Sequence, residues 1–328
     1  MNTCIIHGIG TYVPSRMLTN DDLSRIVDTN DEWITTRTGI KKRHVLADDE
    51  NASDAGLHAA QQALADAGLD AKSVSHVLVA TCTPDYLCPS VACILAGKLG
   101  CNPVMALDFN AACSGFIYGL DMARSIIAAN PDATILLISS EALTRRVNWQ
   151  DRSTCVLFGD GAGAIVLRGG QHGAGMGQIK DTTCLSDGTL WELITIGGGT
   201  KKRYELEEPV GEDFFLHMQG REVFKHAVRN MASICQTVLT RNNMTINDVD
   251  LLVPHQANVR IIEAVGSRLD MPAERVFINV HEYGNTSSAS VVLALADARA
   301  QGRLKPGSQV LAASFGAGLT WGAVLLQF

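Results

Sequence analysis

One of the nine cysteines, Cys113, occupies a position in which a thiol can act as a nucleophile. Residues 104–108 are predicted to form a strand and residues 113–129 a helix, so Cys113 opens that helix. The N-terminus of a helix carries free N–H groups and a partial positive charge, which favour a thiolate. We therefore expect the pKa of Cys113 to fall and its sulfur to attack an electrophilic carbon. A buried packing thiol is the ordinary interpretation, and we keep it for most of the other cysteines.

A histidine and an asparagine stand at the ends of two further predicted elements. His255 follows the strand predicted at residues 251–253, and Asn285 precedes the helix predicted at residues 286–300. Taken singly, His255 fits a hydrogen-bonded loop residue, and Asn285 fits a helix N-cap. An internal repeat weakens both interpretations, because it places the Cys113 and Asn285 segments at equivalent positions with the His255 segment beside them. We expect the three side chains to converge on one pocket.

The chain contains the same order of helices and strands twice. Alternating helices and apolar, β-branched strands predict an α/β fold whose strands are covered on both faces. We predict two similar halves, residues 1–170 and 171–328, stacked about a pseudo-two-fold axis. The matched pairs are residues 51–68 with 220–243, 77–81 with 251–253, 104–108 with 275–280, 113–129 with 286–300, 134–138 with 309–313, and 161–167 with 320–326.

Two glycine-rich stretches have other interpretations. The stretch Gly159-Asp-Gly-Ala-Gly163 leads into a predicted strand, whereas a dinucleotide fingerprint follows a strand and opens a helix. We therefore expect tight backbone packing there and no nucleotide. Residues 197–213 are rich in glycine, then basic, then acidic, which predicts a surface loop.

Composition narrows the classes of function. Of the 328 residues, 46% are hydrophobic and 19% charged, which is typical of a globular protein, and the net charge is −7. The chain lacks a long Lys/Arg block, which argues against nucleic acid as the main partner. No apolar run is long enough to cross a bilayer, and no targeting signal is visible. The scattered cysteines argue against disulfides and against a metal site. We expect a cytoplasmic protein that needs no metal.

The chain resembles the type III β-ketoacyl-acyl-carrier-protein synthases of the thiolase superfamily, and the resemblance runs from Gly8 to Phe328. It rests on several motifs in the right order: Asp31-Glu-Trp-Ile34, Arg37-Thr-Gly39, Ala111-Ala-Cys-Ser-Gly115, Phe158-Gly-Asp-Gly-Ala-Gly163, Val253-Pro-His-Gln-Ala-Asn258, Gly284-Asn-Thr-Ser287, Phe315-Gly-Ala-Gly318 and Thr320-Trp-Gly322. The family fold is a duplicated set of α-β-α-β-α layers.

The resemblance implies roles for individual residues. Cys113 matches the acylated nucleophile, His255 and Asn285 complete the triad, and the backbone N–H groups of Cys113 and Ala317 match the oxyanion hole. Trp33 and Arg152 match the pair that holds the adenine of coenzyme A. Further substrate-tunnel positions are Thr29, Arg37 and Asn258, and the basic positions that meet the acidic carrier protein are Lys225, Arg260 and Arg268.

The implied reaction is a decarboxylative Claisen condensation of an acyl-CoA primer with malonyl-acyl-carrier protein, which starts fatty acid biosynthesis. The family also implies a homodimer and no cofactor other than the coenzyme A thioester substrate. Two departures bear on substrate choice. The loop 197–213 is longer than usual, and Cys88 stands where some members have an aromatic residue. A smaller side chain at Cys88 leads us to expect primers longer than acetyl.

Other functions in the same superfamily remain open. A specialised condensing enzyme or acyltransferase of secondary metabolism would have the same triad, and a non-catalytic acyl-binding module is the alternative from another class. A degradative thiolase needs a second cysteine where this chain has Ser314-Phe-Gly316. A hydroxymethylglutaryl-CoA synthase needs a glutamate acting on Cys113, for which Glu141 is the remaining candidate. A cysteine protease also pairs Cys with His, but the duplicated α/β pattern does not suit it.

Overall fold

The computed structural model describes residues 3–171, 173–198 and 211–328. Its main feature is a nine-stranded sheet in the order β11-β12-β13-β8-β1-β7-β6-β4-β5, and two small sheets pair β9 with β10 and β2 with β3. The strands are β1 Thr3–Tyr12, β2 Met17–Thr19, β3 Lys42–His44, β4 His76–Ala80, β5 Met105–Phe109, β6 Thr134–Glu141, β7 Gly161–Gly170, β8 Gly177–Ser186, β9 Ile194–Ile196, β10 Leu216–Met218, β11 Leu251–Pro254, β12 Gln309–Gly316 and β13 Thr320–Gln327.

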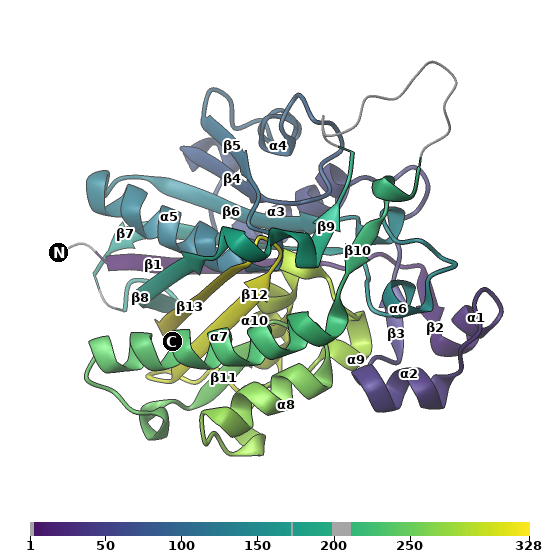
Figure 1. Cartoon of the computed structure of the whole chain (residues 1–328). Helices are drawn as coiled ribbons and strands as arrows, with labels where there is room; N and C mark the ends of the chain where they lie inside the picture. Colours follow the sequence, from purple (N-terminus) through teal and green to yellow (C-terminus); the bar gives the residue numbers. More distant parts are fainter. Residues whose placement is uncertain (1–2, 172, 199–210) are drawn as a thin grey trace.

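The helices form three layers, one on the outer face of each half of the sheet and one between the two halves (Figure 1). They are α1 Asn20–Ser24, α2 Asp31–Thr38, α3 Ala52–Asp66, α4 Val91–Leu99, α5 Gly115–Ala129, α6 Arg152–Cys155, α7 Gly220–Arg241, α8 Val259–Arg268, α9 Val280–Tyr283 and α10 Ser290–Ala300. Helices α3 and α4 cover the strands of the N-terminal half, and α7 and α8 cover those of the C-terminal half. Helices α5 and α10 contact strands of both halves and form the middle layer. Three buried hydrophobic clusters fill the spaces between these layers.

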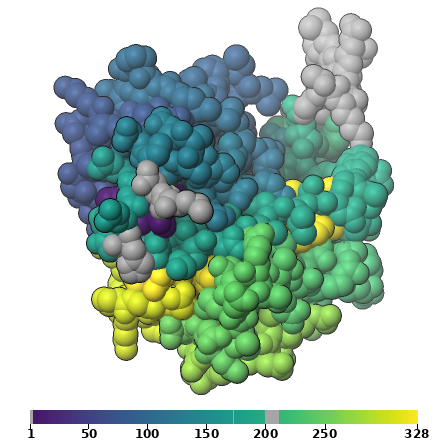
Figure 2. Space-filling view, turned by 90° about the vertical axis from the view of Figure 1, so that its left-hand side faces the viewer, coloured from purple at the N-terminus to yellow at the C-terminus, as the bar shows by residue number. Residues whose placement is uncertain are grey.

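Apart from the end strand β5, which has no counterpart, the sheet has the same strand order when it is followed inward from either end. In the N-terminal half, β5 and β6 flank β4 in parallel, and β7 and β1 follow in antiparallel orientation. In the C-terminal half, β11 and β12 are parallel, and β13 and β8 follow in antiparallel orientation. Strands β1 and β8 join the halves, which lie one above the other in Figure 2. The chain boundary at residues 170 and 171 stays a prediction.

Most predicted elements are present within a few residues of their predicted limits, but the strand predicted at residues 275–280 is wrong. Val276 makes a single parallel bridge to Leu252, and the backbone then turns into the short helix α9. The side-chain oxygen Oε1 of Gln256 accepts the N–H groups of Asn279 and Val280, at 2.9 and 3.2 Å, and so draws the backbone out of the sheet. The charged part of the loop predicted at 197–213, residues 199–210, lies outside the described residues.

The parallel strands determine where the chemistry-bearing residues gather. Parallel strands end at one edge of a sheet, and the segments that follow β4, β5, β11 and β12 meet there. These segments carry Cys82, Cys113, His255 and Ala317. Among the helices of the described residues, none combines the length and the hydropathy that a membrane span requires.

Candidate active site

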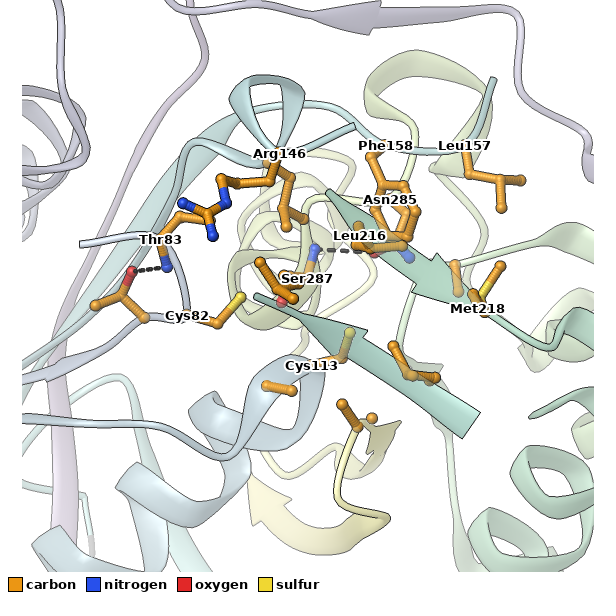
Figure 3. Close-up of a pocket in the computed structure, with 18 of the residues that line it drawn as sticks. Cys82, Thr83, Cys113, Arg146, Leu157, Phe158, Leu216, Met218, Asn285 and Ser287 are labelled. Atoms are coloured by element: carbon orange, nitrogen blue, oxygen red, sulfur yellow. Dashed lines mark hydrogen bonds between the residues drawn. The ribbon is translucent and has the colours of Figure 1, made fainter. Parts of the chain in front are cut away.

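A cavity of about 1480 Å³ runs into the protein at this edge of the sheet. Cys113, His255 and Asn285 all lie in its wall, as predicted from the repeat. Cys82, Cys113 and Ser287 gather around one part of the cavity, and apolar side chains, among them Leu157 and Met218, lie on the other side (Figure 3). The cavity therefore offers a thiol beside a largely apolar space.

Cys113 lies in the 3₁₀ turn Ala112–Ser114, directly before α5. The preceding residue, Ala112, has a φ of 47°, and Ser287, before α10, has a φ of 50°. The same turn therefore occurs at equivalent points of the two halves. On its other side, Cys113 touches the end of β12 so closely that a Cβ on Gly316 would lie 2.7 Å from the Cys113 nitrogen. Glycine at 316 lets the segment that contains Ala317 approach the nucleophile.

The pKa of Cys113 differs from the sequence-based prediction. Burial raises it to about 12, and the nearby Glu141 carboxyl acts in the same direction. The prediction of a lowered pKa is therefore wrong for the free protein. Cys113 lines a cavity inside the protein, where loss of contact with water disfavours the thiolate. Burial likewise raises the pKa of Cys82 well above its ordinary value.

The structure surrounds His255 with neutral groups. Its Nδ1 lies 2.6 Å from the hydroxyl oxygen of Ser290, and both side chains are buried. Burial lowers the pKa of His255 from its ordinary value of 6.5 to about 3. The ring is therefore neutral across the physiological pH range.

Asn285 is held by the backbone on either side. Its N–H donates to the Leu157 carbonyl at 2.8 Å, and its carbonyl accepts the Gly159 N–H at 3.1 Å. The side-chain oxygen Oδ1 accepts the N–H of Ser287 at 2.9 Å, a bond drawn in Figure 3. Because Oδ1 is occupied, the side-chain NH₂ group is the part of Asn285 that can donate a hydrogen bond into the cavity.

Two backbone N–H groups beside the thiol are free to bind an oxyanion. The N–H groups of Cys113 and Ala317 form no hydrogen bond to any residue in the described ranges. Ala317 lies just after β12, and the close approach at Gly316 places this segment against Cys113. Donors fixed by the backbone in this way can stabilise negative charge without reorganising.

An aromatic and two arginines form a stack near the cavity mouth. The guanidinium carbons of Arg37 and Arg152 lie 4.8 and 4.7 Å from the ring centre of Trp33. Arg152 also donates to the Asp28 carbonyl at 2.8 Å. Asn258 caps α8 and donates from its side chain to the Arg37 carbonyl at 3.1 Å. The stack thus places two positive charges over the ring of Trp33.

The remaining predicted site residues fall into two groups. Lys225 and Arg260 are exposed at the mouth and line the cavity with Trp33, Arg37, Asn258 and Ala317. Thr29, Arg152, Arg268 and Cys88 do not line it. Arg268 is exposed in the last turn of α8, and Cys88 is exposed on a loop whose Tyr86 and Leu87 do line the cavity. The Thr29 hydroxyl is buried and has no partner among the described residues.

Sequence reasoning named Glu141 as a candidate but missed the buried polar cluster that surrounds its carboxylate. The carboxylate of Glu141 accepts hydrogen bonds from the Thr83 hydroxyl at 2.8 Å, the Cys82 N–H at 3.1 Å and the Ser288 hydroxyl at 2.9 Å. Burial raises the pKa of Glu141. Glu141 does not line the cavity, so it is poorly placed to act on a substrate as a hydroxymethylglutaryl-CoA synthase requires. The polar run Thr81-Cys82-Thr83 after a parallel strand was the available signal for this cluster.

Within the described ranges, no cluster of three or more His, Cys, Asp or Glu side chains is arranged to hold a metal ion. The chemistry that the described groups can perform is nucleophilic attack by sulfur, assisted by neutral hydrogen-bond donors.

Comparisons with known proteins agree with this site. The family model described as 3-oxoacyl-[acyl-carrier-protein (ACP)] synthase III matches residues 107–188, and the model for the C terminal of that synthase matches residues 239–328. The chain is 62% identical over 325 residues to the β-ketoacyl-[acyl-carrier-protein] synthase III of Nitratidesulfovibrio vulgaris (strain DSM 19637 / Miyazaki F), with 99% of this chain and 98% of the relative covered.

Solved structures are similar over their whole length. The 3-oxoacyl-[acyl-carrier-protein] synthase III from Aquifex aeolicus VF5 superposes with a TM-score of 0.91 at 43% identity, covering 100% of both chains. The priming β-ketosynthase from the R1128 polyketide biosynthetic pathway superposes with a TM-score of 0.91 at 32% identity, covering 99% of this chain and 96% of that chain. The mixed α/β fold with a large central sheet is thus shared with both.

Proposed function

Because this chain belongs to the β-ketoacyl-[acyl-carrier-protein] synthase III family, we propose that it condenses an acyl-CoA primer with malonyl-acyl-carrier protein and so starts fatty acid biosynthesis. The observation that carries this proposal is the meeting of Cys113, His255 and Asn285 in the wall of one cavity. A thiol and two neutral donors suit acyl transfer followed by decarboxylation.

In the first half-reaction, the Cys113 sulfur attacks the thioester carbonyl of the acyl-CoA. The N–H groups of Cys113 and Ala317 bind the tetrahedral oxyanion. The carbon–sulfur bond to coenzyme A then breaks, and the thiol proton of Cys113 ends on the departing CoA sulfur. The free thiol is protonated at neutral pH because burial raises its pKa to about 12. We therefore infer that deprotonation accompanies the attack.

In the second half-reaction, the malonyl thioester loses CO₂, and the electron pair moves onto its thioester oxygen as an enolate. His255 and the side-chain NH₂ of Asn285 donate hydrogen bonds to that oxygen. The enolate carbon then attacks the acyl carbonyl on Cys113, the acyl–sulfur bond breaks, and the β-ketoacyl thioester leaves. The neutral state of His255, whose pKa is lowered to about 3 by burial, supports a donor role.

The surface around the mouth supports the proposed substrates. The stack of Arg37 and Arg152 over the ring of Trp33 supplies an aromatic ring and two positive charges, which suit an adenine ring and its phosphates. Arg260 presents positive charge at the same opening, where an acidic carrier protein would dock. Lys225 lines the same cavity, but its Nζ lies 2.7 Å from the carboxylate of Glu222, so the ion pair lowers its contribution. Arg268 and Thr29 lie outside the cavity wall, and we assign them to the outer docking surface and to support of the Trp33 segment.

We further infer a cytoplasmic homodimer that joins the β5 edges of two copies. Strand β5 has one neighbour, β4, and its Met105 and Leu107 side chains are 47% and 38% exposed. The adjoining loop exposes Tyr86 at 62% and Leu87 at 84%. An open, apolar strand edge of this kind is a template for pairing with another strand. The nine free cysteines suit a reducing compartment.

Mass spectrometry and a decarboxylation assay test the proposal. Incubation with acyl-CoA should add one acyl group to the wild-type protein, and Cys113→Ala should abolish the addition. His255→Ala and Asn285→Ala should still acquire the acyl group but release CO₂ from malonyl-carrier protein about 10²–10³-fold more slowly. An acyl label on another cysteine would refute the assignment of Cys113. An unlabelled wild-type protein would favour a non-catalytic binding module, and a preference for unusual primers would favour secondary metabolism.

A further inference from the structure

The first residue of α10 contacts the ring of His255. The Ser290 hydroxyl oxygen lies 2.6 Å from His255 Nδ1, and it also accepts the N–H of Gln256 at 3.3 Å. Ser290 and His255 are 2% and 3% exposed, so water does not compete for these bonds. The contact therefore joins the start of α10 to the ring that lines the cavity.

The hydrogen bonds of the Ser290 hydroxyl determine where the imidazole proton lies. Its oxygen accepts the Gln256 N–H, and its single proton needs an acceptor. Within the described ranges, the group that can accept that proton is His255 Nδ1. A neutral imidazole whose Nδ1 accepts a hydrogen bond carries its proton on Nε2. The opposite tautomer would leave the buried hydroxyl proton unpaired, which disfavours it about tenfold or more.

The backbone around His255 is fixed as firmly as the ring. The His255 N–H donates to the Ala313 carbonyl at 2.7 Å. The Gln256 side chain donates to the carbonyls of Pro254 and Phe277 at 2.8 and 3.1 Å. Its oxygen accepts the N–H groups of Asn279 and Val280. The amide side chain of Gln256 thus uses both its donors and both its acceptor positions to fix the end of β11, from which His255 projects. The backbone N–H of Gln256 donates to the Ser290 hydroxyl.

We propose that Ser290 is a positioning residue that locks His255 into the Nε2–H tautomer, with its N–H directed into the cavity. The lock has a consequence for both half-reactions. With its proton already on Nε2, His255 donates to the enolate oxygen of the malonyl substrate. For the same reason, Nε2 cannot accept the thiol proton of Cys113. Ser290 therefore makes His255 a hydrogen-bond donor in decarboxylation and prevents it from acting as the base in acyl transfer. This division of roles rests on the function proposed above.

Histidine ¹⁵N NMR tests the lock directly. The protein has nine histidines, and the signals of His255 are identified by their loss in His255→Gln. In the wild-type protein, Nδ1 of His255 should be unprotonated and Nε2 protonated. Ser290→Ala should give a mixture of tautomers, whereas Ser290→Thr keeps the hydroxyl and should restore the wild-type signals.

The kinetic test separates the two half-reactions. Ser290→Ala should decarboxylate malonyl-carrier protein about two- to tenfold more slowly, in proportion to the fraction of His255 that carries its proton on Nδ1, while its Cys113 acylation by acyl-CoA stays within about 1.5-fold of the wild-type rate. Ser139→Ala is the matched control, because it also removes a buried hydroxyl, one that has no partner among the described residues. This variant should leave both rates unchanged.

Two results would overturn the inference. One is a wild-type His255 that carries its proton on Nδ1, a measurement that does not depend on any variant folding. The other is Ser290→Ala with wild-type rates in both half-reactions. A wild-type protein that shows the Nε2–H tautomer but forms no β-ketoacyl product would instead overturn the proposed function.

Discussion

Substituting Gly316 by Ala should impair the acylation of Cys113. A Cβ at this position would lie 2.7 Å from the Cys113 nitrogen and 3.1 Å from its Cβ, whereas an ordinary contact begins near 3.4 Å. The two segments must therefore separate by about 0.7 Å. The Cys113 N–H is one of the two proposed oxyanion donors, so this separation displaces a group that must be placed accurately.

The size of the effect follows from that displacement. A misplacement of about 1 Å typically costs about 10²-fold in rate, so we expect acylation to slow roughly ten- to a hundredfold. Crowding in a packed interior should also lower the free energy of unfolding by about 1–3 kcal/mol. Rapid-quench mass spectrometry of the acyl-enzyme measures the first quantity, and denaturant unfolding measures the second.

A second glycine provides the matched control. Gly161 is also buried in a strand, but a Cβ there would lie 3.4 Å or more from its neighbours. Gly161→Ala should therefore acylate at close to the wild-type rate. If Gly316→Ala were folded and acylated as fast as the wild type, the close approach of Gly316 to Cys113 would have no bearing on catalysis, and the reasoning would be refuted.

Three further predictions concern acid stability, docking and primer length. Burial lowers the pKa of His255 from 6.5 to about 3, so between these pH values His255 is protonated in the unfolded protein and neutral in the folded one. As the pH falls through this window, the wild-type protein should therefore lose about 1.4 kcal/mol of stability per pH unit relative to His255→Gln. Parallel unfolding curves for the two proteins between pH 6 and 4 would contradict the buried, neutral state. Arg260→Glu should raise the KM for malonyl-carrier protein about tenfold and leave the KM for acyl-CoA nearly unchanged. Equal changes would exclude a docking role, and so would the same change in the control Lys72→Glu, because Lys72 is exposed before the start of β4, at the opposite end of that strand from the site. Cys88 does not line the cavity of its own protomer, so its effect on primer length depends on the proposed homodimer, in which its loop reaches the acyl cavity of the partner subunit. Each added methylene that is buried there contributes about 0.8 kcal/mol, so the wild type should accept primers longer than acetyl and Cys88→Phe should shift the preference toward acetyl; an unchanged primer profile would leave Cys88 without a role in selectivity.

The sequence was sufficient to predict the elements of the repeat and the meeting of Cys113, His255 and Asn285. Both results depend on local patterns: apolar periodicity locates strands and helices, and parallel strands bring their ends to one edge. The strand predicted at 275–280 failed because the side chain of Gln256 binds two backbone N–H groups there, a non-local contact that periodicity does not report.

The burial of individual side chains was the second property that could not be predicted from the sequence. The start of a helix is visible in a sequence, but the enclosure that raises the pKa of Cys113 depends on segments from both halves. The cluster around Glu141 and the contact between Ser290 and His255 were missed for the same reason. Each joins residues from different strands or helices, and serines and threonines are too common for their spacing alone to indicate a partner.

The position of β1 in the sheet has a consequence for synthesis of the chain. Strand β1, residues Thr3–Tyr12, is made well before its neighbours β7 and β8, which begin at Gly161 and Gly177. At a ribosomal rate of roughly 5–20 residues per second, its first neighbour emerges on the order of 10 s later. During that interval Cys4, Ile5 and Ile6, which are buried in the finished protein, have no sheet to join. The nascent β1 segment is thus an apolar strand without a partner, and a chaperone that binds it should increase the yield of folded enzyme.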